Sequence, residues 1–492
     1  MNNVFKNKHD LGFRLKNTYA ELPGVFMTKL SPTPVKKPEL ILLNDDLAND
    51  LGLNLSLANK DLIASIFSGN VSYEKFNYIA QAYAGHQFGF FTVLGDGRAL
   101  LLGEQTTTTN KIFDIQLKGS GPTPYSRGGD GRSALGPVLR EYVLSEAMHA
   151  LKIPTTRSLA AVSTGQNVLR DRDLPGAVLT RVASSHIRFG TFEYIAMKKD
   201  LKSLRVLINY TIERHYPGLK NKEFAALLLL KEIIKRQASL IVDWMRVGFV
   251  HGVMNTDNMT VSGETIDYGP CAFMDSYKLK TVFSSIDHAG RYSYGNQPSV
   301  AHWNLVRFAE AILPAIDDDE KKALEMAQAA LNDFVNIYKN KWLNMMRKKL
   351  GLFGNQGEDE GLINDFLSWM EKRGHDFNYS FYCLEDDSLL KKEFAGDLVF
   401  ESWLVGWKKR LSANKESFEK SKEMMQLNNP FVIPRNSLVE EALDAACLSK
   451  DFSLTKSLIA VLKKPYKRRL GVEKYSKPPK KNNAEYVTFC GT

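Results

Sequence analysis

The sequence predicts an α+β fold in which a β-rich first half precedes a helical second half. Short apolar runs separated by glycine turns fill residues 76–134, a pattern typical of strands and hairpins. From about residue 300 onward, long stretches repeat apolar residues with helical spacing. With 492 residues, of which 44% are hydrophobic and 24% charged, the chain has the size and composition of two or three packed globular units.

The expected strands lie between glycine-rich turns. FFTVLGDGRALLLGEQ is interpreted as a strand, a glycine turn and a second strand. FDIQLKG and VLTRV (178–182) predict two further strands, and MTVSGETIDYG predicts a hairpin. Residues 1–75, which contain three prolines between positions 32 and 38, are expected to form an irregular arm with short helices.

The expected helices follow apolar residues at helical spacing. One runs from Pro137, a favourable first helical position, to a stop at Pro154. Another covers residues 222–247. Later helices are predicted for WNLVRFAEAIL, KKALEMAQAALNDFVNIY, INDFLSWMEKR and LVEEALDAACL. A nucleotide cleft between the β-rich and helical halves is expected, because ligand sites favour such junctions.

Several classes of protein do not fit the composition. No run of about 18 apolar residues predicts a membrane span, and the start, MNNVFKNKHD, lacks the apolar core of a secretion signal. A cytoplasmic protein is therefore expected. Cys271, Cys383, Cys447 and Cys490 lie far apart without zinc-ligand spacing, so reduced thiols are predicted.

The formal net charge of +10 does not by itself indicate a nucleic-acid partner. Much of the excess lies in KKPYKRRLGVEKYSKPPKK, which is interpreted as a solvated tail. Binding of nucleic acid by this tail stays open as a distant alternative, which a strongly salt-dependent affinity for DNA would support.

The segment HGVMNTDN (251–258) is the first candidate for catalytic chemistry. Its His and Asn are separated by the same seven positions as in the H-R-D-x-x-x-x-N loop of protein kinases, and Asp267-Tyr268-Gly269 resembles D-F-G. Asn258 and Asp267 therefore fit as oxygen ligands of one Mg²⁺ ion on a triphosphate. The alternative is an Asx-rich turn that caps a helix.

One position departs from the kinase pattern. Val253 stands where kinases carry the catalytic Asp, and valine cannot accept a proton. Asp257 is the nearest carboxylate that is able to act as the general base.

Three further features fit a phosphate site. Lys118 ends a predicted strand, and either Glu141 or Glu146 on the next helix would hold it. The turns GDGR (95–98) and GGDGR (128–132) offer backbone N–H groups to an anion, although each alone is more often a plain turn. Arg181 and Arg188 would fork onto phosphate oxygens, or lie at the surface.

Together these stretches resemble the selenoprotein O family, called YdiU in bacteria. The resemblance is dense from about residue 17 to residue 298 and reappears weakly in NPFVIPRNSLVEEAL. The stretches that carry it are NTYAELP, SPTPV, AYAGHQFGFFTVLGDGRALLLGE, LKGSGPTPYSRGGDGRSALGPVLREYVLSEAMHAL, LTRVASSHIRFGTFE, GFVHGVMNTDNM, DYGPCAFMD and GRYSYGNQP.

The resemblance implies a protein-kinase-like bilobal fold with terminal extensions. The expected divisions are an extension (1–75), a β-rich N-lobe (76–177), a helical C-lobe (178–430) and a C-terminal helical segment with a basic tail (431–492). It also implies that ATP binds flipped relative to kinases. AMP then passes to Ser, Thr or Tyr hydroxyls of proteins, the enzyme itself included, and pyrophosphate leaves.

The resemblance also assigns roles. Asp257 becomes the proton acceptor, Asn258 and Asp267 bind Mg²⁺ or Mn²⁺, and Glu141 pairs with Lys118. The nucleotide contacts are Gly95, Gly97, Arg98, Lys118, Asp130, Gly131, Arg181, Arg188 and Asp267.

The redox element of the family is altered in this chain. Cys490 stands three residues from the end, where members often carry selenocysteine or cysteine, but Val487 takes the place of a C-x-x-C partner. Phe283 lies near the place of a loop cysteine found in some bacterial members, and Cys271 is the possible substitute.

Three alternatives to AMP transfer stay open. UMP transfer from UTP would use the same site, and nothing in the sequence distinguishes the base. A γ-phosphoryl kinase is disfavoured by Val253. A non-catalytic nucleotide-binding scaffold is disfavoured by the complete set of Asp257, Asn258 and Asp267.

Overall fold

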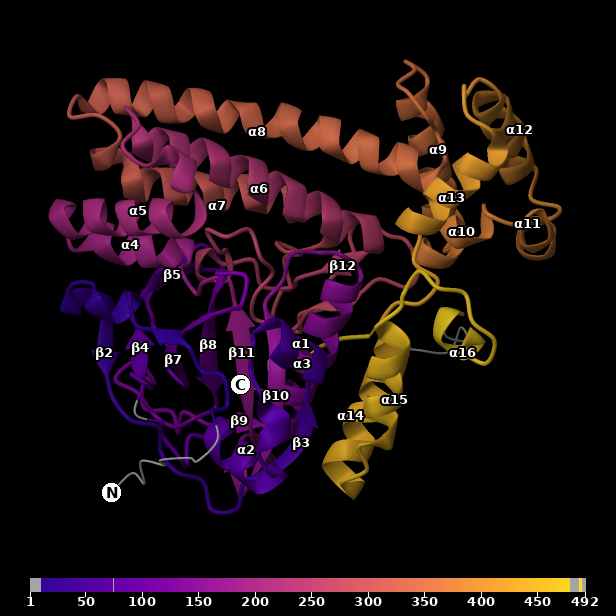
Figure 1. Cartoon of the computed structure of the whole chain (residues 1–492). Coiled ribbons are helices and arrows are strands. Elements are labelled where there is room, and N and C mark those ends of the chain that lie inside the picture. The colour runs from indigo at the N-terminus through magenta and orange to yellow at the C-terminus, as the bar shows by residue number, and fades with distance from the viewer. Residues whose placement is uncertain (1–9, 74, 478–485, 489–492) are drawn as a thin grey trace.

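The computed structural model describes residues 10–73, 75–477 and 486–488, in which an antiparallel sheet lies beneath a layer of helices (Figure 1). Seven strands of this nine-stranded sheet run in the order β2-β4-β7-β8-β11-β10-β3, while β1 pairs with β7 and β9 with β11. Their bounds are β1 Leu15–Lys16, β2 Met27–Lys29, β3 Glu39–Leu43, β4 Ile79–Gln81, β7 Ala99–Thr106, β8 Ile112–Lys118, β9 Ser133–Ala134, β10 Arg157–Leu169 and β11 Asp173–Ala183.

The alternation of side chains along the strands gives the sheet two buried faces. Leu100, Ile115 and Leu117 belong to the core beneath helices α1 (Asp45–Asp50) and α2 (Lys60–Phe67). Leu101 belongs to the core on the other face, which continues into the helical layer. Because Lys118 follows Leu117, its side chain lies on the face opposite to α1 and α2.

The strands predicted from glycine-rich sequence are confirmed, but two parts of the sheet differ from the prediction. Residues 15–43, expected to be irregular, supply β1, β2 and β3. The long strand β10 was not expected, because its sequence RSLAAVSTGQNVL is rich in small residues and lacks apolar alternation. It lies between β11 and β3, and helices α3 (Leu135–Ala150), α1 and α2 pack against it.

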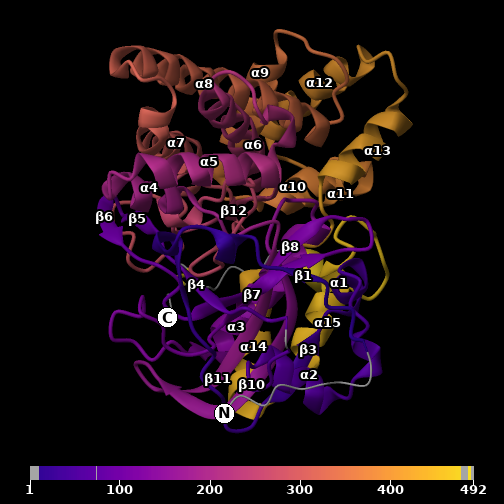
Figure 2. The same ribbon diagram turned by 60° about the vertical axis from the view of Figure 1, so that its left-hand side comes forward.

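Helix α3 (Leu135–Ala150) packs against β10 and β11. It begins two residues before Pro137 and ends four before Pro154, so the predicted helix is correct in place and short at its start. Helices α14 (Asn436–Ser449) and α15 (Ser453–Leu462) pack against α3 in turn. The C-terminal part of the chain therefore returns to the sheet (Figure 2).

The helical layer contains the later helices that the sequence predicts, except LVEEALDAACL, which forms α14 beside α3. Helices α6 and α8 lie along each other, and α4 packs against α7 (Figure 1). The bounds are α4 Phe189–Met197, α5 Leu201–His215, α6 Ala225–Val247, α7 Gln297–Ile312, α8 Glu320–Lys349, α9 Asp359–Arg373, α10 Phe377–Cys383, α11 Asp387–Phe394, α12 Leu398–Ser412, α13 Phe418–Asn428 and α16 Glu473–Ser476. In the described part of the chain, none of the helices has the length and apolarity needed to cross a membrane.

The hairpin predicted for MTVSGETIDYG is wrong. Thr260 forms an isolated bridge with Arg188, and Thr265 forms one with Thr155, so the two arms pair with other segments instead of with each other. A turn closes the segment, because the Thr260 hydroxyl accepts a hydrogen bond from the Glu264 N–H at 2.9 Å. Two small pairs, β5 (Ala84–Gln87) with β6 (Phe90–Val93) and β12 (Phe249–Val250) with β13 (Ala272–Phe273), flank this region.

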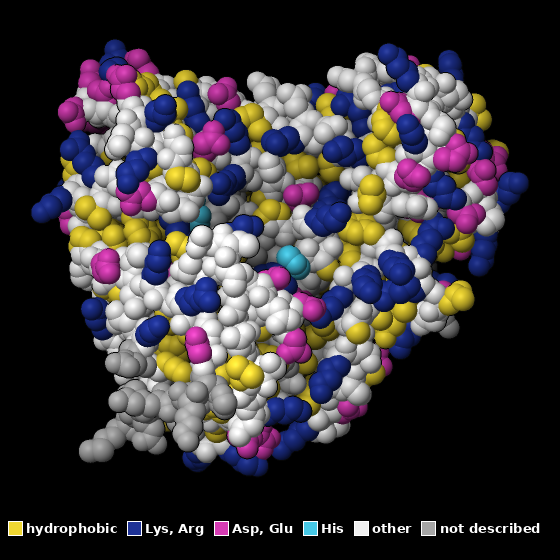
Figure 3. All heavy atoms as spheres, viewed as in Figure 1, with side chains coloured by type: hydrophobic (Ala, Val, Ile, Leu, Met, Phe, Trp, Pro, Cys, Tyr) yellow, Lys and Arg dark blue, Asp and Glu magenta, His cyan; other side chains and the backbone are white. Residues whose placement is uncertain are grey.

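The predicted solvated tail is also only partly correct. Arg468 forms an ion pair with buried Glu385 at 2.6 Å, and Tyr475 is buried. Lys and Arg side chains gather where residues 463–469 leave α15, beside the helices of the upper layer (Figure 3). This basic stretch is therefore packed against the body, and residues 478–485 lie outside the described part.

Candidate active site

A hollow of about 990 Å³ opens between the sheet and the helical layer. Every residue that the sequence singled out for nucleotide, metal or proton chemistry lines it. They are Gly95, Gly97, Arg98, Lys118, Asp130, Gly131, Glu141, Arg181, Arg188, Asp257, Asn258 and Asp267.

Two glycine turns form one wall of the hollow. A Cβ atom on Gly95 would lie 2.7 Å from a ring carbon of Tyr125, and one on Gly97 would lie 2.9 Å from the Tyr125 carbonyl oxygen. Gly131, whose φ is +64°, accepts a hydrogen bond from the N–H of Gly121 at 3.0 Å. The glycines are therefore needed because the two turns pack closely against residues 121–126.

Five charged side chains meet at the centre. Lys118 Nζ lies 2.6 Å from Glu141 Oε2 and 2.9 Å from Asp267 Oδ1. Arg181 Nη1 lies 2.6 Å from Asp267 Oδ1, and Arg188 Nη1 lies 2.5 Å from Asp267 Oδ2. One carboxylate thus holds three cations that come from β8, from β11 and from the residue before α4.

Of the two carboxylates left open by sequence spacing, Glu141 is the one paired with Lys118. Glu146 lies on the same helix and pairs with Arg157 at 2.7 Å. It also accepts a hydrogen bond from the Ser158 N–H at 3.0 Å, which fixes it against the start of β10.

The charge balance of the hollow favours an anionic ligand. Burial alone would raise the pKa of Asp267, but Lys118, Arg181 and Arg188 together hold it well below its usual range. Arg98 also lines the hollow, and no carboxylate of a described residue lies within ion-pairing distance of it. Nine Lys and Arg residues and seven Asp and Glu residues line the hollow, an excess of positive charge that suits phosphate groups.

Asp257 differs from Asp267 in its surroundings. It is buried, and its Oδ1 atom has no hydrogen-bond partner among the described residues. Burial raises the pKa of Asp257 to about 6, although the neighbouring Arg188 lowers it in part. This unpartnered oxygen lies against Gly85 of β5. A buried carboxylate with a pKa near neutrality suits a general base.

The hollow also contains oxygen atoms of the type that a hard divalent cation takes as ligands. Asn258 Nδ2 donates to the carbonyl oxygen of Val253 at 2.9 Å, which leaves Oδ1 as the amide atom available to a ligand. Carboxylate oxygens of Asp257 and Asp267 lie in the same hollow. Mg²⁺ and Mn²⁺ prefer such oxygen ligands.

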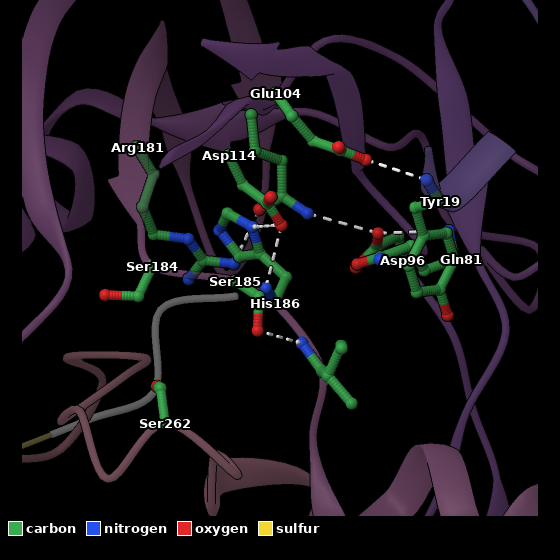
Figure 4. Close-up of polar contacts among 12 residues, drawn as sticks. Tyr19, Gln81, Asp96, Glu104, Asp114, Arg181, Ser184, Ser185, His186 and Ser262 are labelled. Carbon is green, nitrogen blue, oxygen red and sulfur yellow. Dashed lines mark hydrogen bonds and ion pairs between the residues drawn. The ribbon is translucent and has the colours of Figure 1, made fainter. Parts of the chain in front are cut away.

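Sequence reasoning missed a buried polar layer behind the cations. The Arg188 guanidinium lies 4.7 Å from the centre of the Tyr83 ring. Two residues before Arg188, His186 contacts Asp114 of β8, as Figure 4 shows next to Arg181. Burial lowers the pKa of His186 to about 4, so this ring is neutral near pH 7. Nothing in the local sequence distinguishes these residues from ordinary core residues.

The described residues near the C-terminus also reach the hollow. The Thr488 N–H donates to the Phe283 carbonyl oxygen at 2.7 Å, and the Thr488 hydroxyl donates to that of Pro270 at 2.8 Å. Arg140 Nη1 of α3 donates a hydrogen bond to the Tyr486 hydroxyl at 3.1 Å. Cys271 is buried, whereas Cys490 lies outside the described residues, so the redox pairing stays a prediction.

Comparison with known proteins agrees with these motifs. The model of the family described as protein adenylyltransferase SelO matches residues 11–463. Relatives named protein nucleotidyltransferase YdiU from Bacillus mycoides and Alkaliphilus metalliredigens are 53% and 54% identical, over 99% and 98% of this chain and 100% and 98% of theirs. A relative of the same name from Pelagibacter ubique is 52% identical over 98% of this chain and 100% of its own. The predicted family is thereby confirmed, and the chain belongs to the SelO family of protein adenylyltransferase enzymes.

Proposed function

We propose that this protein transfers AMP from ATP to Ser, Thr or Tyr hydroxyls of proteins in the cytoplasm, itself included, and releases pyrophosphate. The observation that carries the proposal is the arrangement of two unlike carboxylates. Asp267 is bound by three cations, whereas Asp257, next to it in the same hollow, is buried with an unpartnered oxygen.

The proposed fold is that of a two-lobed kinase, with a β-rich lobe (76–177), a helical lobe (178–430) and extensions at 1–75 and 431–492. The sheet of the β-rich lobe also takes in β1, β2 and β3 from the first extension and the end of β11. ATP would bind flipped relative to kinases, with its α-phosphate toward Asp257. The loss of the kinase base at Val253 supports this proposal, since the remaining carboxylate lies four residues further along the loop.

In the proposed reaction, Lys118, Arg181 and Arg188 exchange Asp267 for oxygens of the triphosphate. Asp257 takes the proton of the acceptor hydroxyl, whose oxygen attacks the α-phosphorus. The bond from this phosphorus to the oxygen bridging the α- and β-phosphates breaks, and pyrophosphate leaves with that oxygen. Mg²⁺ or Mn²⁺ held by Asn258 and Asp267 would neutralise negative charge on the phosphates.

The test uses ATP labelled at the α position or, separately, at the γ position, with Mg²⁺ or Mn²⁺, followed by intact mass of the protein. Label from the α position alone, with mass gains of one AMP unit, is expected. Label from the γ position would instead identify a kinase. Binding of ATP without any label would identify a scaffold, and α-label from UTP in preference to ATP would identify UMP transfer.

A further inference from the structure

A second, shallower hollow lies beside the catalytic loop, on the side away from the nucleotide pocket. We call it the flank groove, and its principal lining residues are Phe88, Ile286, His288, Arg291, Val300 and Trp303. It lies where the β5–β6 hairpin meets α7; the hairpin appears beside α4 in Figure 2.

Three hydrogen bonds connect the flank groove to the catalytic loop. Asn255 Oδ1 accepts from the Phe88 N–H at 3.0 Å and from the Tyr292 hydroxyl at 2.5 Å. The His86 N–H donates to the Thr256 hydroxyl at 2.7 Å. Asn255 also lines the nucleotide pocket, so this residue separates the two hollows. In the sequence it lies two residues before Asp257.

Arg291 is the cation of the flank groove. Its guanidinium lies 4.7 Å from the centre of the Trp303 ring and 5.7 Å from that of Tyr292. The nearby carboxylate of Asp287 accepts the backbone N–H groups of Arg291 and Tyr292, at 2.9 and 2.8 Å. Within the described ranges, no carboxylate lies within ion-pairing distance of the guanidinium, which is therefore held in place without a counter-ion.

Apolar side chains stand exposed around this cation. Ile286, which lines the groove, is 56% exposed. In the neighbouring strand β6, Phe91 is 42% exposed and Phe90 is 78% exposed. The centres of the Phe91 and Trp303 rings lie 5.3 and 5.4 Å from the centre of the His86 ring. Exposed aromatic groups around an arginine are typical of a surface that binds another protein.

We propose that the flank groove binds an extended segment of the acceptor protein that carries an acidic and an apolar residue close to the modified hydroxyl. This inference rests on the proposed AMP transfer and specifies its substrate. An extended chain advances about 3.3 Å per residue, so side chains two or three positions from the hydroxyl lie about 7–10 Å from it.

Charge complementarity favours an acidic segment over other occupants. Residues 276–296 contain Lys278, Lys280 and Arg291 but a single acid, Asp287, which is occupied by backbone N–H groups. The carboxylate of the acceptor binds Arg291, and its apolar neighbour packs on the exposed rings. Binding of nucleic acid in the groove is the alternative, and competition by an oligonucleotide tests it.

The test measures transfer of α-label from ATP to dodecapeptides with one central serine, which carry Glu or Lys at each flanking position beside Leu. The wild-type enzyme is expected to prefer Glu at one defined distance from the serine. Arg291→Glu is expected to raise the KM for the Glu peptide about tenfold or more and to favour the Lys peptide, with the affinity for ATP unchanged.

Arg307→Glu is the matched control, because Arg307 also lies over Trp303, at 5.2 Å, yet pairs with Glu310 at 2.6 Å. The control is expected to leave peptide preference unchanged. If Arg291→Glu transfers label with the same preference between the Glu and Lys peptides as the wild-type enzyme, the inference about the groove is wrong while the proposed function stands. The same holds if an oligonucleotide competes with the acceptor and the Glu peptide does not. Absence of α-label on every acceptor would instead overturn the proposed function.

Discussion

The carboxylate of Asp257 occupies the space in which a side chain on residue 85 would begin. A Cβ atom on Gly85 would lie 2.7 Å from Asp257 Cγ and 2.9 Å from Asp257 Cβ. The first strand of the small hairpin thus sets the position of the proposed base, and only glycine leaves it room.

Gly85→Ala is therefore expected to displace Asp257 and to lower kcat for AMP transfer by about 10²-fold or more, the range that a general base contributes. Affinity for ATP is expected to change little. Gly361→Ala on α9 is the control, since nothing lies within 4 Å of a Cβ there. Equal loss of activity in both variants, measured by initial rates, would contradict this role of Gly85.

Replacement of the two carboxylates is expected to have different effects. Asp257→Ala is expected to weaken transfer strongly and to leave nucleotide binding intact, because its proposed role is limited to accepting the proton of the acceptor hydroxyl. Asp267→Ala abolishes transfer, because it removes a proposed metal ligand. Label transfer and, separately, calorimetric binding of ATP measure the two effects, and normal activity in either variant would refute the assignment.

Glu141→Gln is expected to raise the KM for ATP about tenfold, because Lys118 and Arg181 lose the carboxylate that orients them at 2.6 and 3.3 Å. Glu146→Gln is the matched control on the same helix. It breaks the pair with Arg157 and is expected to lower stability without changing this KM. The measurement is the KM for ATP of both folded variants, and an equal KM in the two would contradict the role of Glu141.

Arg435 binds Asp376 at 2.5 Å and Asp275 at 2.7 Å, and all but 2% of its side chain is buried. Arg435→Ala is expected to lower the free energy of unfolding by about 3–5 kcal/mol, because it leaves a buried carboxylate without a partner. Lys463→Ala breaks an exposed pair with Asp46 and is expected to cost about 1 kcal/mol or less. Urea denaturation would compare them, and similar losses would contradict the distinction.

Burial raises the pKa of Glu385 to about 7, although Arg468 opposes the shift. Because the folded state holds this proton more tightly, its contribution to stability is complete below about pH 4.3 and is lost as the pH rises through 7. Glu385→Gln removes this dependence. From pH 5 to pH 8, the wild-type protein is therefore expected to lose roughly 3 kcal/mol of unfolding free energy relative to the variant. Parallel curves would disprove the shift.

The sequence predicted the parts of the site that are encoded by neighbouring residues. The spacing from His251 to Asn258 and the strand that ends at Lys118 were recognisable because each fits within one loop or one strand. The spacing favoured Glu141 as the partner of Lys118 but did not exclude Glu146, since the choice depends on which side of α3 faces β8 and which faces β10.

Features that depend on distant segments could not be predicted. Thr488 contacts Pro270 and Phe283 across more than 200 residues, and β3 joins the sheet beside β10, far along the chain. The arms of residues 259–269 alternate like a hairpin but bridge to Arg188 and Thr155. Their partners are determined by tertiary packing, which the local pattern does not contain.

The contacts of Asp267 with Lys118, Arg181 and Arg188 also bear on selectivity among anions. This carboxylate neutralises part of the positive charge of the pocket, so an anion would have to displace it to reach the three cations. A small ion such as inorganic phosphate replaces one set of charge contacts with another and gains little. A nucleotide would add contacts through its base and sugar, so we expect the pocket to bind a nucleotide in preference to simple anions.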